Sequence, residues 1–331
     1  SQTFSQQEYS RLFQRDRVWL SSGTEYSSGG NWAQYASQFG TFGQASYALD
    51  AVYSAQNGER PNEDLSQLTV YGKFKQQLTP QDSVFLQTIY YDYESGDVRQ
   101  YYDPASASHT LRFVERQEPS AFLGYHRAWG PGSHTLVMAA RLDDEVELME
   151  PAARILTLAR NPDGSIRRGI DLDFGQRYHS KLEAYSAELQ QVWQNESHTL
   201  ILGGRFQTGE VHTESAITRS PTAFPANLIE APILQGNTQN LERFSFYAYH
   251  HWQLFEPLRV IAGLSYDRLV FPKNVDFPPI SEGQRDEEQV SPKAGFVWTP
   301  AQNTAVRGMF SQSLGGLYYD TSVRLEPTQL A

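Results

Sequence analysis

Apolar and polar side chains alternate with a period of two along most of this chain. In residues 198–207, for example, Leu200, Leu202 and Phe206 alternate with Arg205 and with other polar or small residues. Successive side chains of a β-strand point to opposite faces of the sheet, whereas helical faces recur every three to four residues. The pattern therefore predicts half-exposed strands, and it recurs in residues 133–143, 243–252 and 258–267.

The predicted strands are long. They run to roughly 10 to 14 residues, whereas an ordinary globular strand has about 5 or 6. A strand that crosses a bilayer needs about nine or more tilted residues. About thirteen segments qualify on pattern and length, and they are 17–25, 31–38, 43–55, 65–77, 84–95, 117–129, 133–146, 181–194, 198–212, 241–253, 258–271, 289–299 and 303–313.

The connections between these segments alternate in length. Short turns fall at 79–82, 130–132, 195–197, 254–257 and 300–303. Long polar stretches fall at 96–116, 147–180, 213–240 and 272–288, and residues 147–160 could form a short helix or extend a strand. Tight turns at one end and long loops at the other are typical of outer-membrane barrels. We therefore predict an all-β, antiparallel, up-and-down transmembrane β-barrel region, partial, with about 12 to 14 strands.

The tryptophans support a membrane location independently of the connections. Trp129, Trp193, Trp252 and Trp298 each stand just before a short turn, in phase with the apolar face of their own strand. Aromatic rings of this kind collect where lipid meets water. We predict that these four residues form an interface girdle.

The polar phase of the same strands would line the interior of a barrel. Charged residues in that phase are candidates for lumen-facing positions: Arg141, Glu188, Arg205, Arg243, Arg259, Asp267, Lys293 and Arg307. Mixed charge suits a wet interior that contacts a plug or passes solute. It does not identify a solute.

Composition narrows the class of protein further. The net charge is −11 and the sequence pI is about 5.2, which argue against a nucleic-acid partner because phosphates require a basic face. No apolar run of about 18 residues is present, so a helical membrane span is excluded. The 13% aromatic content argues against disorder, and the absence of cysteine excludes thiolate metal sites and a cysteine nucleophile.

The sequence offers little chemistry of the catalytic kind. It has no phosphate-binding glycine loop and no nucleophile elbow. His250 and His251 are neighbours in a predicted strand, so they point to opposite faces and cannot share a metal. The acidic run from Asp143 to Glu147 could bind a cation, but a solvated rim of negative potential is the favoured interpretation. We expect no enzymatic activity, no cofactor and no metal site.

One hairpin and two end segments resemble a known family. Residues 289–316, QVSPKAGFVWTPAQNTAVRGMFSQSLGG, resemble the barrel hairpins of TonB-dependent outer-membrane receptors. The end segments YSRLFQRDRVW (9–19) and VRLEPTQLA (323–331) resemble the barrel part of proteins that join tetratricopeptide repeats to such a barrel. The resemblance covers nearly the whole chain, although its motifs describe hairpin architecture and not a binding site.

The resemblance implies a function and a set of partners. It implies a bacterial outer-membrane receptor and transporter that takes up a small, unidentified ligand. It also implies contact with outer-membrane lipid, a plug domain and a TonB energising complex. Three alternatives stay open: a passive porin-like or secretion channel, a soluble β-rich glycan-binding protein, and a barrel enzyme with carboxylates and histidines at the mouth of its lumen.

The resemblance also sets expectations for domain organisation. We expect a lead-in segment at residues 1–16 and the barrel region at residues 17–331, incomplete at its C-terminus. The expectation rests on strand number, since transporters of this kind close with 22 strands. It also rests on the terminal aromatic residue of family barrels, which Ala331 does not match.

Overall fold

The structure is a computed structural model that describes residues 16–219, 233–273, 280, 283–314 and 325–326. The lead-in segment expected at residues 1–16 lies outside this part except for Asp16. The described chain forms one 13-stranded antiparallel sheet with a short 3-10 helix, η1 (Pro104–Ser106), between the fifth and sixth strands. Within these residues, no helix has the length and apolar character needed to cross a membrane.

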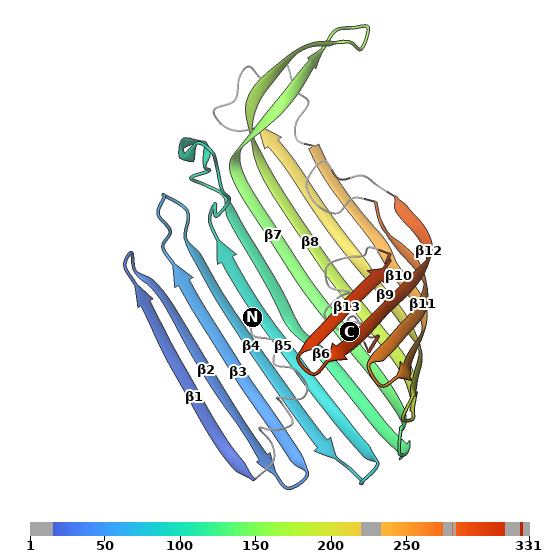
Figure 1. The fold of residues 1–331 in the computed structure, drawn as a ribbon. Coiled ribbons are helices and arrows are strands. Elements are labelled where there is room, and N and C mark those ends of the chain that lie inside the picture. Colours follow the sequence, from blue (N-terminus) through green and yellow to red (C-terminus); the bar gives the residue numbers. More distant parts are fainter. Residues whose placement is uncertain (1–15, 220–232, 274–279, 281–282, 315–324, 327–331) are drawn as a thin grey trace.

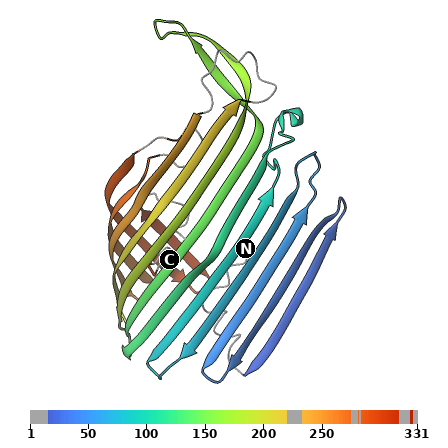
Figure 2. The same cartoon turned by 180° about the vertical axis from the view of Figure 1, so that it is seen from behind.

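The strands pair in sequence order, so the sheet is an uninterrupted up-and-down meander. They are β1 (Arg17–Ser27), β2 (Asn31–Phe42), β3 (Ala45–Gln56), β4 (Leu65–Gln77), β5 (Asp82–Ser95), β6 (Arg112–Gly130), β7 (Ser133–Arg160), β8 (Ile166–Gln194), β9 (His198–Arg219), β10 (Ile233–Phe255), β11 (Leu258–Pro272), β12 (Gln284–Ala301) and β13 (Thr304–Ser311). The sheet is open and nearly flat over β1 to β6, then curls so that β12 and β13 stand in front of β6 (Figure 1). The same curl is visible from behind (Figure 2). One face of the sheet is therefore concave, and we call it the inner face.

The two edges of the sheet differ as the sequence predicts. Short turns join the strands at one end of the sheet, and most of the connections at the opposite end are longer (Figure 1). We call these two rims of strand ends the turn edge and the loop edge; neither term refers to the outermost strands. Two predicted long loops are largely strand, because β7 and β8 continue to Arg160 and Ile166, and β9 continues to Arg219. Residues 147–160 are thus a strand extension and not a helix. The β8 extension alternates in the same way, with Ile170, Leu172 and Phe174 against Asp171 and Asp173, and its pairing with β7 continues over this stretch.

The outward face carries an apolar band of limited height. On β10 it runs from Trp252 to Phe244, which is about 26 Å along the strand at about 3.3 Å per residue. At a tilt of about 40° this is roughly 20 Å along a membrane normal, close to the apolar band of about 25 Å in outer-membrane barrels. Beyond the band, the outward positions become charged, as at Glu183, Glu242 and Arg268.

The strand β7 departs from the predicted phase. Met138 pairs with Glu188 and is buried on the inner face, whereas Val137 pairs with Leu189 and is exposed on the outward face. We expected the opposite, because Arg141, a lumen candidate, shares the phase of Val137. Both faces of this strand are apolar, so its own sequence does not determine which one turns outward, and the register with β8 decides it.

Candidate functional site: the inner wall and the loop-edge rim

The inner face of β8 to β12 is a polar wall built in register rows. One row joins Glu188, Arg205, Ser245 and Asp267, because each residue pairs with the next across adjacent strands. All four side chains are at least nine-tenths buried. Three of them were predicted lumen candidates that lie far apart in the sequence. The antiparallel register brings them together on one face.

An ion pair occupies the centre of this wall. The guanidinium of Arg243 donates to the carboxylate of Asp267 at 2.7 Å, and both side chains are 5% exposed. The Ser245 hydroxyl donates to the same carboxylate oxygen at 2.6 Å and accepts a hydrogen bond from Arg243 Nε at 3.1 Å. A buried carboxylate and a buried cation are tolerated when each satisfies the other, as here.

Two glycines make room for two tyrosines on the same wall. A β-carbon at Gly203 would lie 2.2 Å from the Tyr247 ring, and one at Gly263 would lie 2.4 Å from the Tyr249 ring. The rings therefore lie flat over the backbone of the neighbouring strand, which glycine in a strand permits. Both hydroxyls reach into the polar network: Tyr247 donates to Glu188 at 2.7 Å, and Tyr249 donates to Glu326.

The remaining lumen candidates occupy different surroundings. Lys293 lies on the inner face and contacts the Glu326 carboxylate at 2.8 Å. Arg259 lies on the inner face at the turn edge, where its Nε donates to Gln253 at 3.1 Å. Arg307 shares the inner phase through its pairing with Val297, on the exposed strand β13.

Arg141 lies on the opposite face from its predicted position. It pairs with Tyr185 and Ala121 on the outward face and forms ion pairs with Asp143 and Glu183 at 2.6 and 3.4 Å. The placement follows from the inverted phase of β7. At this height the apolar band ends, so an outward arginine meets acidic partners rather than lipid.

The four tryptophans predicted to form an interface girdle all lie on the outward face next to the turn edge. Trp129, Trp193, Trp252 and Trp298 are between 43% and 62% exposed. The Arg127 guanidinium also stacks over the Trp129 ring, with its central carbon 4.3 Å from the ring centroid. This arrangement is the geometry that an interface girdle needs.

The acidic run after Arg141 does not form an isolated negative rim. Glu145 contacts His179 at 2.8 Å, and Glu147 contacts Arg177 at 3.1 Å, both on the outward face. On β12, Asp286 pairs with Arg268 at 2.7 Å. The predicted negative potential at the mouth is therefore reduced by basic partners on the adjacent strand. Among the described residues, no group of three or more His, Asp or Glu side chains could hold a metal ion.

His250 and His251 point to opposite faces, as the strand period requires. The outward His250 ring stacks on His198, with Nε2 and Nδ1 at 3.0 Å, and both rings stack near Trp252. His251 is partly buried on the inner face beside Arg259 at the turn edge. The two histidines therefore belong to separate environments.

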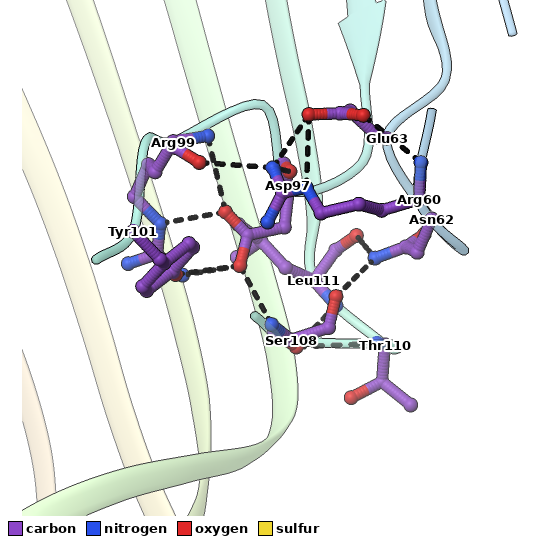
Figure 3. A network of polar contacts seen from close by, with 9 residues as sticks. All are labelled: Arg60, Asn62, Glu63, Asp97, Arg99, Tyr101, Ser108, Thr110 and Leu111. Carbon is purple, nitrogen blue, oxygen red and sulfur yellow. Dashed lines mark hydrogen bonds and ion pairs between the residues drawn. The ribbon is translucent and has the colours of Figure 1, made fainter. Parts of the chain in front are cut away.

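A polar network fixes the rim at the loop edge (Figure 3). The Asp97 side chain is 0% exposed and accepts from Arg99 at 2.9 Å, from the Tyr101 hydroxyl at 2.6 Å and from the Ser108 amide at 2.7 Å. Arg60 donates to the carbonyls of Asp97 and Arg99 at 3.1 and 2.9 Å. The loop after β5 is thus closed around a single carboxylate and tied to the loop before β4.

Further contacts join this rim to the long hairpin of β7 and β8. Asn62 donates to the carbonyls of Ser108 and Leu111 at 3.0 Å each. Leu111 packs in a buried apolar cluster with Leu148, Tyr178 and Ile280. The rim therefore has a built structure from β4 to β8. Sequence reasoning missed it, although the turn-forming run from Pro61 to Asp64 was a local signal for its first loop.

The network lowers the pKa of Asp97. Burial alone would raise it, but the hydrogen bonds from Arg99, Tyr101 and the Ser108 amide stabilise the ionised carboxylate and hold the pKa well below its ordinary value. A depressed folded-state pKa contributes stability that is fully present above the ordinary value of about 4. This stability is lost only as the pH falls through the lower folded value.

We expect Asp97→Asn to loosen this loop. The neutral amide keeps the shape but loses charge-assisted acceptance, so amide hydrogen exchange across residues 97–111 should accelerate by about tenfold or more at pH 7. In the unsubstituted chain, protection should persist down to about pH 4. The matched control is Asp103→Asn, because Asp103 only caps η1 and asparagine caps equally well. Equal exchange in both variants would contradict the assigned role of Asp97.

The geometry of the sheet and its two faces identifies the class of protein. A long-stranded antiparallel meander with an apolar outward band, an aromatic turn edge and a charged inner wall is the wall of an outer-membrane type β-barrel. The chain belongs to the family of TonB-dependent receptor-like β-barrels, because the sequence model of that family matches residues 1–328. The relation to tetratricopeptide-repeat proteins stays a prediction.

Solved structures with the same fold are transporters and receptors. The copper transporter OprC aligns with a TM-score of 0.63 at 10% identity, over 88% of this chain and 44% of that one. BauA, the ferric preacinetobactin receptor from Acinetobacter baumannii, gives 0.63 at 10% identity, over 88% and 47%. The ferric-catecholate import receptor Fiu from E. coli K12 gives 0.60 at 9% identity, over 90% and 54%.

These likenesses concern the fold, and this chain spans about half of each of those proteins: 44%, 47% and 54%. No curated protein matches the sequence of this chain.

Proposed function

We propose that this chain forms the barrel wall of an outer-membrane receptor that takes up a small ligand by the TonB-dependent route. The observation that carries the proposal is the division of the two faces. The outward face has an apolar band of membrane height that ends at four tryptophans, while the inner face of the same strands buries charged residues. A soluble β-protein has no need of this arrangement.

The rim is the part of the chain best suited to first contact with a ligand. The Asp97 network holds the loop after β5 through hydrogen bonds within the chain. A preorganised loop loses little conformational entropy on binding, which favours affinity. Cargo recognition would begin at this edge, and a plug domain and the TonB complex would control passage through the lumen. The solved neighbours include a copper transporter and two receptors for ferric chelates, which favours metal or ferric-chelate cargo.

The proposal is tested first by heat-modifiability in detergent. The full-length protein is run on a denaturing gel before and after boiling, because a closed barrel resists the detergent until it is heated. We expect a clear mobility shift on boiling. A protein that is monodisperse in buffer without detergent and shows no shift would contradict the proposal and favour a soluble binding protein.

Passive conduction is separated from energised uptake by a second measurement. Ligand accumulation is compared in cells with and without an intact TonB complex. Loss of uptake without TonB supports the receptor, whereas unchanged uptake supports a porin-like channel.

A further inference from the structure

The inner wall holds a segment of the same chain by its backbone. Both carboxylate oxygens of Glu188 accept from consecutive amides: Oε2 from Leu325 N and Oε1 from Glu326 N, at 2.9 Å each. The side-chain amide of Gln190, two residues along β8, donates to the Leu325 carbonyl at 2.7 Å. Two neighbouring side chains thus bind both amides and one carbonyl of this dipeptide, which lies in a bend of the chain.

The same site also binds the side chain of Glu326. Lys293 lies 2.8 Å from its carboxylate, and the Tyr249 hydroxyl donates to the same oxygen. Tyr249 is 1% exposed and Glu326 is 6% exposed, so water competes little for these groups. A cation and a phenol that converge on one buried position favour an acidic side chain over a neutral one.

A second contact holds the chain against this wall between β13 and the dipeptide. Leu314, three residues beyond the end of β13, packs against the buried cluster that includes Leu182, Leu241 and Leu269 on the inner face. The chain after β13 therefore meets the inner wall at two described points, one apolar and one polar. Both points lie on β8 to β12.

We propose that Glu188, Gln190, Tyr249 and Lys293 form a recognition site for an acidic dipeptide held in a bend, and that its ligand is Leu325–Glu326 of the same chain. The site anchors Leu325 and Glu326 on the inner wall. Leu314, Leu325 and Glu326 all contact buried side chains of this wall. These residues therefore lie on the lumen side of the wall. The inference rests on the proposed function for the statement that this wall lines a lumen.

Cysteine labelling tests the anchor directly, because the chain contains no cysteine of its own. A single Leu325→Cys change places a thiol beside the site without altering the backbone groups that Glu188 and Gln190 bind. Labelling by a bulky water-soluble maleimide is then measured on the full-length protein in detergent. We expect slow labelling, and about 10- to 100-fold faster labelling after Glu188→Gln, which removes the charge from the acceptor of both amides.

The matched control is Glu183→Gln. It makes the same change on the same strand, but Glu183 faces outward and contacts Arg141 and Tyr185. Labelling should stay slow in this variant. If Glu188→Gln does not fold, Lys293→Met removes the partner of Glu326 and should also accelerate labelling.

Two results would overturn the inference: fast labelling of Leu325→Cys in an otherwise unchanged barrel, or equal acceleration by Glu183→Gln and Glu188→Gln. The heat shift is recorded for each variant. Fast labelling of a chain that still shifts on boiling would refute the anchor but would not contradict the proposed function. A chain that is monodisperse without detergent and shows no heat shift would contradict the proposed function instead.

Discussion

Asp267→Ala should destabilise the folded protein by about 3–5 kcal/mol, because it leaves the Arg243 guanidinium buried without its carboxylate. The pair is 5% exposed on each side, so water cannot replace the lost partner. The change in free energy of unfolding is measured from urea titrations of the protein in detergent or lipid vesicles. Replacing both partners by apolar residues of similar volume should recover much of the loss.

The adjacent residue supplies the control for this experiment. Arg268 and Asp286 form an ion pair at the same distance of 2.7 Å, but their side chains are 51% and 49% exposed. Asp286→Ala should therefore leave the free energy of unfolding almost unchanged, because solvent screens an exposed pair. Equal losses from Asp267→Ala and Asp286→Ala would mean that burial on the inner wall does not set the energy of the Arg243 pair.

Phe246→Arg should destabilise the protein in a bilayer by about 2–4 kcal/mol, the range for a cation near the midplane of a barrel's lipid face. Phe246 lies in the middle of the outward apolar band and is 53% exposed in the absence of lipid. The measurement is the free energy of unfolding in lipid vesicles. In a soluble β-protein, the same exposed position would tolerate arginine with a change of only about 0.5 kcal/mol.

Asn240→Arg is the matched change for this test. Asn240 is on the same strand and the same face, but above the apolar band. Its replacement should leave stability within about 1 kcal/mol, because charges near the interface are solvated. A flat profile along β10 would contradict the membrane placement of the band.

Much of the sheet could be predicted because strand periodicity is a local property. Alternation at β8 to β12 places Glu188, Arg205 and Asp267 in one phase and the tryptophans in the other, and the structure has both sets on opposite faces. The polar phase of these strands is strongly charged while the opposite phase is apolar. Only the apolar phase of these strands is therefore suited to face lipid, so their orientation could be predicted from the sequence.

The prediction was wrong where local sequence gives no contrast. On β7, Met138 and Val137 belong to opposite phases and are both apolar, so the phase followed from pairing with β8, and Arg141 faces outward. The extensions of β7 and β8 beyond the bilayer region likewise depend on each other's backbone hydrogen bonds. Such partners are far apart in sequence, and their pairing is a property of the sheet as a whole.

The sequence by itself determined the strand type, the alternation of short and long connections, the girdle phase and the charged phase of β8 to β12. Each of these follows from the order of neighbouring residues. Only the tertiary structure decided the phase of β7, the closure of the rim around Asp97 and the seat of Glu326 against Lys293 and Tyr249. These features join segments that are distant in sequence, so register and burial select them, and no local pattern encodes them.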